Sequence, residues 1–131
     1  MNGTEWIVDA QGCSAEALRN VAILRDLFAL IIKDLGLRVI GEAHWHQFPG
    51  TGGVTGMCML SESHLTCHTF PEFGSICINL FCCVPRRRWD FETKLSEILL
   101  ASSVRVVEVE RDYSAHADVS DALEAAGKKS R

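Results

Sequence analysis

The chain carries two kinds of hydrophobic pattern, one with the period of a helix and one with the period of a strand. Apolar side chains recur every three or four positions between residues 15 and 35, which is typical of an amphipathic helix. Ser14 is placed to cap the start of this helix, and Gly36 is placed to end it. A second helix is predicted over residues 91–101, with Asp90 as its cap.

The other apolar segments are shorter and predict β-strands. In chain order these strands are residues 5–10, 37–48, 54–61, 64–70, 75–83 and 103–113. The connections between residues 54 and 83 are too short for the crossovers that parallel strands need, so these strands should be antiparallel. The order of elements predicts an α+β fold, a two-layer sandwich in which two helices cover one face of a mainly antiparallel sheet.

The predicted elements form one domain over residues 1–113, and residues 114–131 are small, polar and charged, as in a flexible C-terminal tail. Two helices on one face leave the other face of the sheet without cover. A second copy of the chain could supply that cover, so we expect a homodimer.

Composition narrows the classes of protein to which the chain can belong. With 131 residues, 47% of them hydrophobic and 23% charged, the chain has the composition of a globular domain. Its net charge of −4 gives no basic footprint for nucleic acid. No apolar run approaches the roughly 20 residues of a membrane span, and the N-terminus lacks the pattern of a secretory signal. We therefore expect a cytoplasmic protein that binds neither membranes nor nucleic acid.

Six cysteines are present, but their spacing does not predict a metal site. No C-x-x-C pair occurs, so a zinc site of the usual spacing is not expected. Most of the cysteines lie in apolar segments, where a free thiol behaves as a small buried hydrophobe. The run Arg86, Arg87 and Arg88 beside Pro85 is more typical of a solvated loop than of a binding patch.

A cluster of polar residues stands between two predicted strands, in the sequence "LSESHLTCHTFPE" over residues 60–72. Glu62 and Ser63 occupy the connection, and His64 and His68 follow on one face of the next strand. A serine needs a base to act as a nucleophile, and no G-x-S-x-G elbow of an α/β-hydrolase is present. Taken alone, the cluster favours a hairpin turn with hydrogen-bonded histidines. A hydrolytic Ser-His-Asp triad is not excluded by the sequence, but no further motif supports it.

The same region resembles the processing and active-site segment of the prokaryotic S-adenosylmethionine decarboxylase proenzymes, a pyruvoyl-dependent family. The resemblance is carried by "GVTGMCMLSESHLTCHTFPEFG" and "INLFCC", and by "GTEWIVDAQGC" and "VRVVEVER" near the two ends. It extends over roughly residues 3–112. The family implies an enzyme that cuts itself and then decarboxylates S-adenosylmethionine for spermidine synthesis, as a homodimer of cleaved protomers.

The resemblance implies a role for each residue of the cleavage step. The hydroxyl of Ser63 attacks the carbonyl carbon of Glu62, and residue 63 becomes an N-terminal pyruvoyl group, which serves as the cofactor. His68 matches the histidine that assists this processing. Thr55 matches a serine whose hydroxyl supports the oxyanion, and threonine keeps that hydroxyl.

Further residues match positions that act on the substrate. Cys83 matches the cysteine that returns a proton to the substrate carbon, whereas Cys82 beside it should face the other way. Phe48 and Phe70 match the aromatic pair that sandwiches adenine, although core packing would equally account for both from the sequence alone. Glu72 matches the carboxylate that binds the ribose hydroxyls.

Some positions depart from the family pattern and leave alternatives open. Glu5 stands where many relatives have histidine, Asn79 stands where some have aspartate, and the loop over residues 49–53 differs in length and composition. Members of the family exist that decarboxylate ornithine or arginine, so a related pyruvoyl decarboxylase is a second interpretation. An unprocessed, non-enzymatic homologue acting as a partner subunit is a third.

Overall fold

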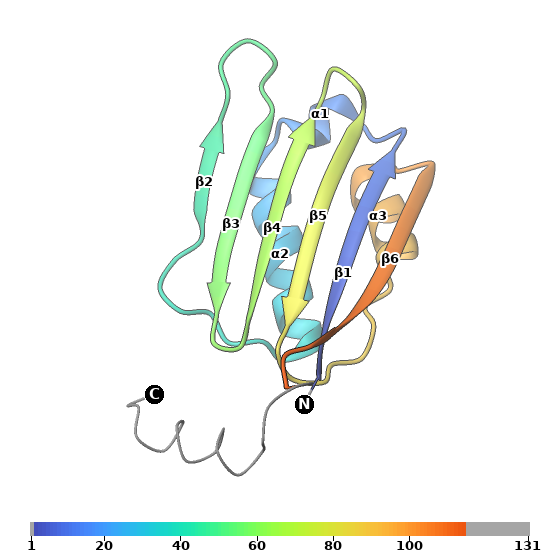
Figure 1. The fold of residues 1–131 in the computed structure, drawn as a ribbon. Helices are drawn as coiled ribbons and strands as arrows, with labels where there is room; N and C mark the ends of the chain where they lie inside the picture. Colours follow the sequence, from blue (N-terminus) through green and yellow to red (C-terminus); the bar gives the residue numbers. More distant parts are fainter. Residues whose placement is uncertain (1, 115–131) are drawn as a thin grey trace.

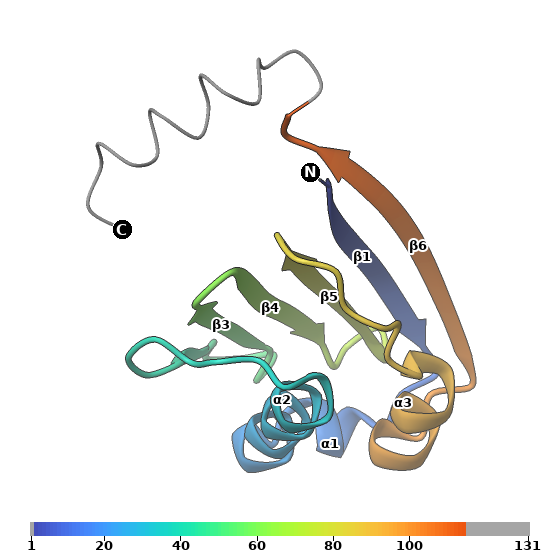
Figure 2. The same ribbon diagram turned by 90° about the horizontal axis from the view of Figure 1, so that it is seen from below.

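The structure, a computed structural model, describes residues 2–114. These residues form one six-stranded antiparallel sheet with strand order β2-β3-β4-β5-β1-β6 and three helices on one side of it (Figures 1 and 2). The elements are β1 (Asn2–Gln11), α1 (Ala15–Leu18), α2 (Val21–Leu35), β2 (His44–Gln47), β3 (Val54–Leu60), β4 (Ser63–Phe70), β5 (Ser75–Cys82), α3 (Phe91–Leu99) and β6 (Ser103–Asp112). The predicted α+β sandwich is confirmed. The predicted C-terminal tail falls almost entirely on residues outside the described range.

The prediction of a single helix over residues 15–35 was wrong in one respect, because the structure has two helices there, α1 and α2. Asn20 stands between them in an extended backbone conformation, and its side chain accepts a hydrogen bond from the Ile23 N–H. This is the geometry of an N-cap, and it starts a new helix one turn after the first has begun. The sandwich therefore has three helices rather than two.

The strand predicted over residues 37–48 is also shorter in the structure, where β2 covers only His44–Gln47. Trp45 anchors this edge strand from the helix side, since its ring lies over Gly56 of β3 and its centroid is 4.8 Å from that of Phe28 on α2. A Cβ atom at Gly56 would lie 2.4 Å from the Trp45 ring, so this contact needs glycine. The rest of the predicted strand is a loop with a single bridge from Val39 to Leu60.

Buried and exposed side chains alternate along the strands, so the two faces of the sheet differ. One face packs on the helices and carries the core, including Trp6, Leu65 and Leu80. The other face, here called the open face, has no helix over it within residues 2–114 (Figure 2). In the same part of the chain, no helix is long and apolar enough to cross a membrane.

A buried threonine ties the sheet to α1. The Thr69 hydroxyl accepts a hydrogen bond from the Val54 N–H at 2.8 Å and donates one to the Leu18 carbonyl at 2.8 Å. Thr69 is 5% exposed, so neither partner has ready access to water if the hydroxyl is removed. The hydroxyl thus links β3, β4 and the end of α1.

We predict that Thr69→Val lowers the free energy of unfolding by about 2–4 kcal/mol, because it leaves a buried donor and a buried acceptor unpaired. Urea unfolding followed by circular dichroism would measure the change. Thr66→Val, on the opposite face of the same strand, is the matched control and should change stability by less than about 1 kcal/mol. Equal effects of the two changes would contradict the role given to Thr69.

Candidate active site

The segment singled out by the sequence is a tight turn between β3 and β4. Leu60 and Ser63 are paired across the two strands, which leaves Ser61 and Glu62 as the turn. The Glu62 carbonyl accepts a hydrogen bond from the backbone N–H of Cys83 at 2.7 Å. The peptide bond between Glu62 and Ser63 is therefore held against the end of β5.

The side chain of Ser63 lies on the helix side of the sheet, as its half-buried position and its pairing with Cys82 show. Burial raises the pKa of the Cys82 thiol, while Arg86 and the hydroxyl of Ser63 act in the opposite direction. Ser63 Oγ is thus in contact with Cys82 rather than with either histidine.

The two adjacent cysteines have different surroundings, as the alternation predicts. Cys82 is 1% exposed and belongs to the core, whereas Cys83 is only half-buried at the end of β5. The carbonyl of Cys83 accepts a hydrogen bond from the Tyr113 hydroxyl at 3.1 Å. Glu62, Ser63 and Cys83 therefore form one group at the β3–β4 turn.

Thr55 and His68 form a second group, on the open face. They face each other across β3 and β4, and Thr55 Oγ1 lies 3.0 Å from His68 Nδ1. This contact fixes the orientation of the imidazole on the open face and occupies its Nδ1 atom. The sequence suggested each residue separately, and the antiparallel register brings them together.

Phe48, Phe70 and Glu72 lie near the second group, at the far end of the sheet from the turn. Phe48 follows β2 and Phe70 ends β4, with β3 between them, so about 10 Å separates their backbones. The two residues are 49% and 38% exposed, which rules out core packing as their role. A Cβ atom at Gly53, between them, would lie 2.7 Å from the Thr69 carbonyl, so glycine allows the strands to approach here.

The structure does not bring the two groups together within one chain. Ser63 and His68 are five residues apart on the same strand, a separation of about 17 Å, and their side chains are on opposite faces. The expectation that His68 reaches Ser63 is therefore not met in a single copy. Residues 2–114 hold two separate groups of candidate site residues, one at each end of the sheet.

Two of the departures from the family pattern, Glu5 and Asn79, are direct partners. Asn79 Nδ2 donates to Glu5 Oε2 at 2.7 Å, and Arg111 donates to the other carboxylate oxygen. His64 Nε2 lies 3.3 Å from Asn79 Oδ1. The sequence did not predict this network, because it depends on the pairing of β1 with β5 and β6, which are distant in sequence.

Hydrogen bonding to Asn79 holds the pKa of the Glu5 carboxyl below its usual range; burial opposes this effect and the guanidinium of Arg111 adds to it. The network therefore keeps a carboxylate ionised on the open face. Within residues 2–114, no group of three His, Cys, Asp or Glu side chains is arranged to hold a metal ion, and the six cysteines are unpaired.

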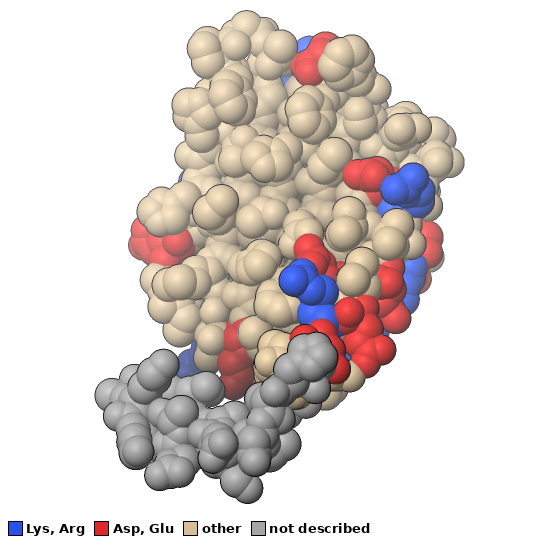
Figure 3. All heavy atoms as spheres, in the orientation of Figure 1, with Lys and Arg blue, Asp and Glu red and all other residues tan. Residues whose placement is uncertain are grey.

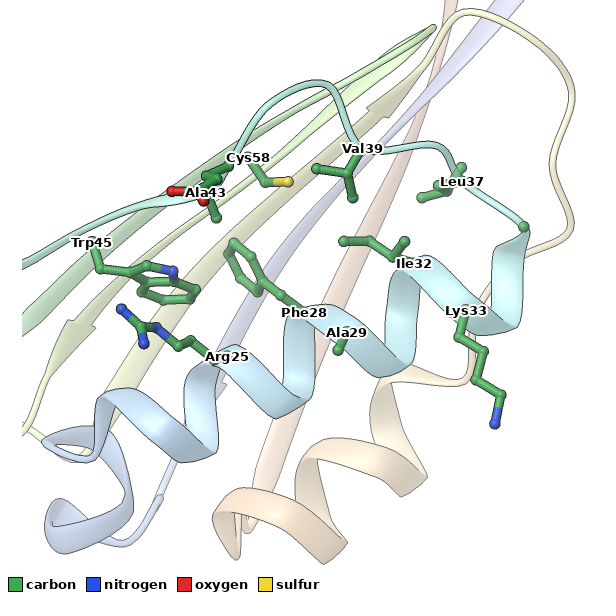
Figure 4. A pocket seen from close by; sticks show the side chains of 12 residues that line it. Arg25, Phe28, Ala29, Ile32, Lys33, Leu37, Val39, Ala43, Trp45 and Cys58 are labelled. Atoms are coloured by element: carbon green, nitrogen blue, oxygen red, sulfur yellow. The ribbon is translucent and has the colours of Figure 1, made fainter.

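A cavity of about 740 Å³ lies elsewhere, between α2 and the edge of the sheet at β2 and β3. Figure 4 shows Phe28 and Trp45 in its wall, with Arg25 and Lys33 on the helix that borders it. None of the residues that the sequence singled out for chemistry lines this cavity. Its size therefore does not make it the active site.

Comparisons with known proteins agree with the sequence resemblance. The family model described as S-adenosylmethionine decarboxylase matches residues 4–112. An S-adenosylmethionine decarboxylase proenzyme of Moorella thermoacetica is 33% identical over 110 residues, covering 83% of this chain and 86% of the relative. A proenzyme of the same name from Caldicellulosiruptor saccharolyticus is 34% identical over 113 residues, covering 83% and 87%.

A solved structure has the same fold. The crystal structure of the adenosylmethionine decarboxylase from Aquifex aeolicus matches with a TM-score of 0.71 and 23% identity, over 88% of this chain and 95% of that one. At this identity the likeness supports the fold alone.

We predict that Asn79→Ala raises the pKa of the Glu5 carboxyl toward its ordinary value of 4.5, because the strongest hydrogen bond to the ionised form is lost. In the native chain, the ionised carboxylate stabilises the fold above that value and the contribution is lost as pH falls through the lowered pKa. A carbon-13 NMR titration of the Glu5 carboxyl would measure the shift. Cys77→Ala, two residues away on the same face, should leave the titration unchanged.

Proposed function

Because the chain belongs to the S-adenosylmethionine decarboxylase family, we propose that it cuts itself between Glu62 and Ser63 and then decarboxylates S-adenosylmethionine. The observation that carries the proposal is the position of the Glu62 carbonyl, 2.7 Å from the backbone N–H of Cys83. This N–H is placed to donate to the negative charge that develops on that oxygen when the peptide bond is attacked.

The cleavage can be written with every atom accounted for. Ser63 Oγ attacks the Glu62 carbonyl carbon, the carbon–nitrogen bond breaks, and the amide becomes an ester with a free amine on residue 63. A base then removes the α-hydrogen of Ser63, and the bond between Cβ and Oγ breaks, which leaves Glu62 as a carboxylate. Water replaces the nitrogen of residue 63, ammonia leaves, and a pyruvoyl group remains.

The turn tolerates such a cut. Glu62 is exposed, and the cleaved bond lies at the very end of the paired ladders, whose hydrogen bonds hold β3 and β4 in the sheet. The two products, residues 1–62 and 63–131, therefore keep the same strand neighbours. The residues present thus fit a prosthetic group formed at position 63.

A second copy of the chain completes the site. His68 and Thr55 are too far from Ser63 in one copy, but two open faces that meet about a two-fold axis running across the strands would place the end carrying His68 over the end carrying Ser63 of the other copy. The α-hydrogen of Ser63 belongs to the backbone at the start of β4, beside the exposed turn residues Ser61 and Glu62. We infer that His68 of the second copy removes it there.

The surface of the open face supports this pairing. Figure 3 shows few charges over β3, β4 and β5, whereas acidic and basic side chains gather over β1 and β6. Met57 and Met59 are 53% and 61% exposed, and Ile7 is also exposed. Burying these side chains between two copies would favour the dimer through the hydrophobic effect.

In the assembled site, each group of residues has its own task. A pyruvoyl group at position 63 would supply a carbonyl that binds the substrate amine and accepts electrons from the bond to the departing carboxylate. Phe48 and Phe70 stack on the adenine, and Glu72 holds the ribose hydroxyls. Cys83, half-buried beside the cleaved turn, donates the proton that replaces carbon dioxide on the substrate carbon.

We predict that freshly purified protein consists of two polypeptides, residues 1–62 and residues 63–131, with the second blocked at its N-terminus. Intact-mass spectrometry would measure both products. Ser63→Ala removes the nucleophile and should remain one chain. A folded native chain that stays whole would reject the self-processing enzyme and favour the non-enzymatic homologue.

We also predict that Phe70→Ala raises the KM for S-adenosylmethionine roughly 5- to 150-fold and leaves self-cleavage intact, because stacking on one base contributes about 1–3 kcal/mol. Release of labelled carbon dioxide would measure turnover. Phe73→Ala, an exposed aromatic in the same turn region, is the control and should change KM little. Carbon dioxide released from ornithine or arginine, and not from S-adenosylmethionine, would favour the related decarboxylase.

A further inference from the structure

The arginine run over residues 86–88 divides into three different environments. Arg87 donates to the Asp34 carbonyl at the end of α2, at 2.8 Å, and Arg88 forms an ion pair with Glu92 at 2.7 Å. Arg86 differs from both, since its guanidinium donates only to the carbonyl of the preceding residue, Pro85, at 3.2 Å within the described residues. The run is therefore not the uniform solvated loop that the sequence favoured.

Arg86 is also unusual in its burial. Among the side chains of residues 2–114, its Nε atom is the one buried nitrogen or oxygen that lacks a hydrogen-bond partner. A buried N–H without a partner costs free energy, and more so on a charged group. The Nε–H group of Arg86 is thus available to an acceptor that residues 2–114 do not provide.

A small polar cavity of about 200 Å³ adjoins this arginine, on the helix side of the β3–β4 turn. Its wall includes Arg86 and Arg38, which bring two positive charges, and the turn residues Glu62 and Ser63. Cys82, which contacts Ser63, completes the wall beside the turn. Two guanidinium groups at one cavity repel each other unless an anion lies between them.

The proposed cleavage creates an anion at this place. The new carboxylate of Glu62 has two oxygens, and one of them is the former carbonyl oxygen, which the Cys83 N–H contacts at 2.7 Å. The other is the former Oγ of Ser63, which lies against Cys82 in the wall of the cavity. The charge is therefore released next to Arg86.

We infer that Arg86, with Arg38 at the rim, binds the C-terminal carboxylate that self-cleavage creates at Glu62. This inference rests on the proposed function, because the ligand does not exist before the cut. Guanidinium and carboxylate groups form paired, charge-assisted hydrogen bonds, which a lysine cannot reproduce with the same geometry. The cavity then anchors the new chain end and holds residues 1–62 and 63–131 together.

The test compares Arg86→Gln in two backgrounds, the cleaved native sequence and the uncut Ser63→Ala chain. Thermal unfolding should show a fall of about 5 °C in the cleaved protein and little change in the uncut one, because only the cleaved protein has the carboxylate. Arg86→Lys should recover part of the fall. Arg87→Gln is the matched control, since its partner is a backbone carbonyl of α2, and it should lower the melting temperature equally in both backgrounds.

Mass spectrometry on each variant separates the outcomes. Equal falls for Arg86→Gln in the two backgrounds would overturn the assignment to the carboxylate and leave self-cleavage standing. A folded Arg86→Gln chain that stays whole would also overturn it, since Arg86 would then act before the cut. A native chain that stays whole overturns this inference together with the proposed function.

Discussion

The two-residue period of side chains along β4 is the constraint on which the rest of this structure depends. It directs the side chains of Leu65, Cys67 and Thr69 toward the core. It places His64 and His68 on the open face. The same period places Ser63 on the helix side, away from His68. Packing of the sheet on its helices therefore separates Ser63, the proposed nucleophile, from His68, the proposed base. A shift of register by one residue would move the core side chains to the open face and the histidines into the core.

Much of the fold follows from local pattern in the sequence, and the differences arise where a single polar residue outweighs the pattern. The apolar spacing of residues 15–35 continues through Asn20, but the cap formed by that side chain divides the helix. Residues 37–43 are apolar enough to be predicted as a strand. In the structure, only His44–Gln47 pairs with β3 over several residues, because the ring of Trp45 packs on Gly56 there. Neither contact can be read from hydrophobic periodicity.

The site could be predicted residue by residue but not in its arrangement. The resemblance names Thr55, His68 and Ser63 without placing them, and only the register of β3 and β4 shows which two are neighbours. The pairing of Glu5 with Asn79 depends on β1 lying beside β5, a contact between segments more than 70 residues apart. Such long-range pairing leaves no local signal in one sequence. Glu5 and Asn79 therefore look like two independent departures from the family pattern until the structure shows that they are hydrogen-bonded to each other.

The central claim is that each active site combines Ser63 of one copy with His68 of another, and co-expression of two inactive chains tests it most directly. A chain carrying Ser63→Ala and a chain carrying His68→Ala, with different tags, can form a mixed dimer in which one site has both native residues. The His68→Ala chain should be cleaved in the mixed dimer and stay largely whole when expressed alone, as intact-mass spectrometry would show. A His68→Ala chain that is cleaved at the native rate by itself, or that stays whole in a verified mixed dimer, would contradict the shared site.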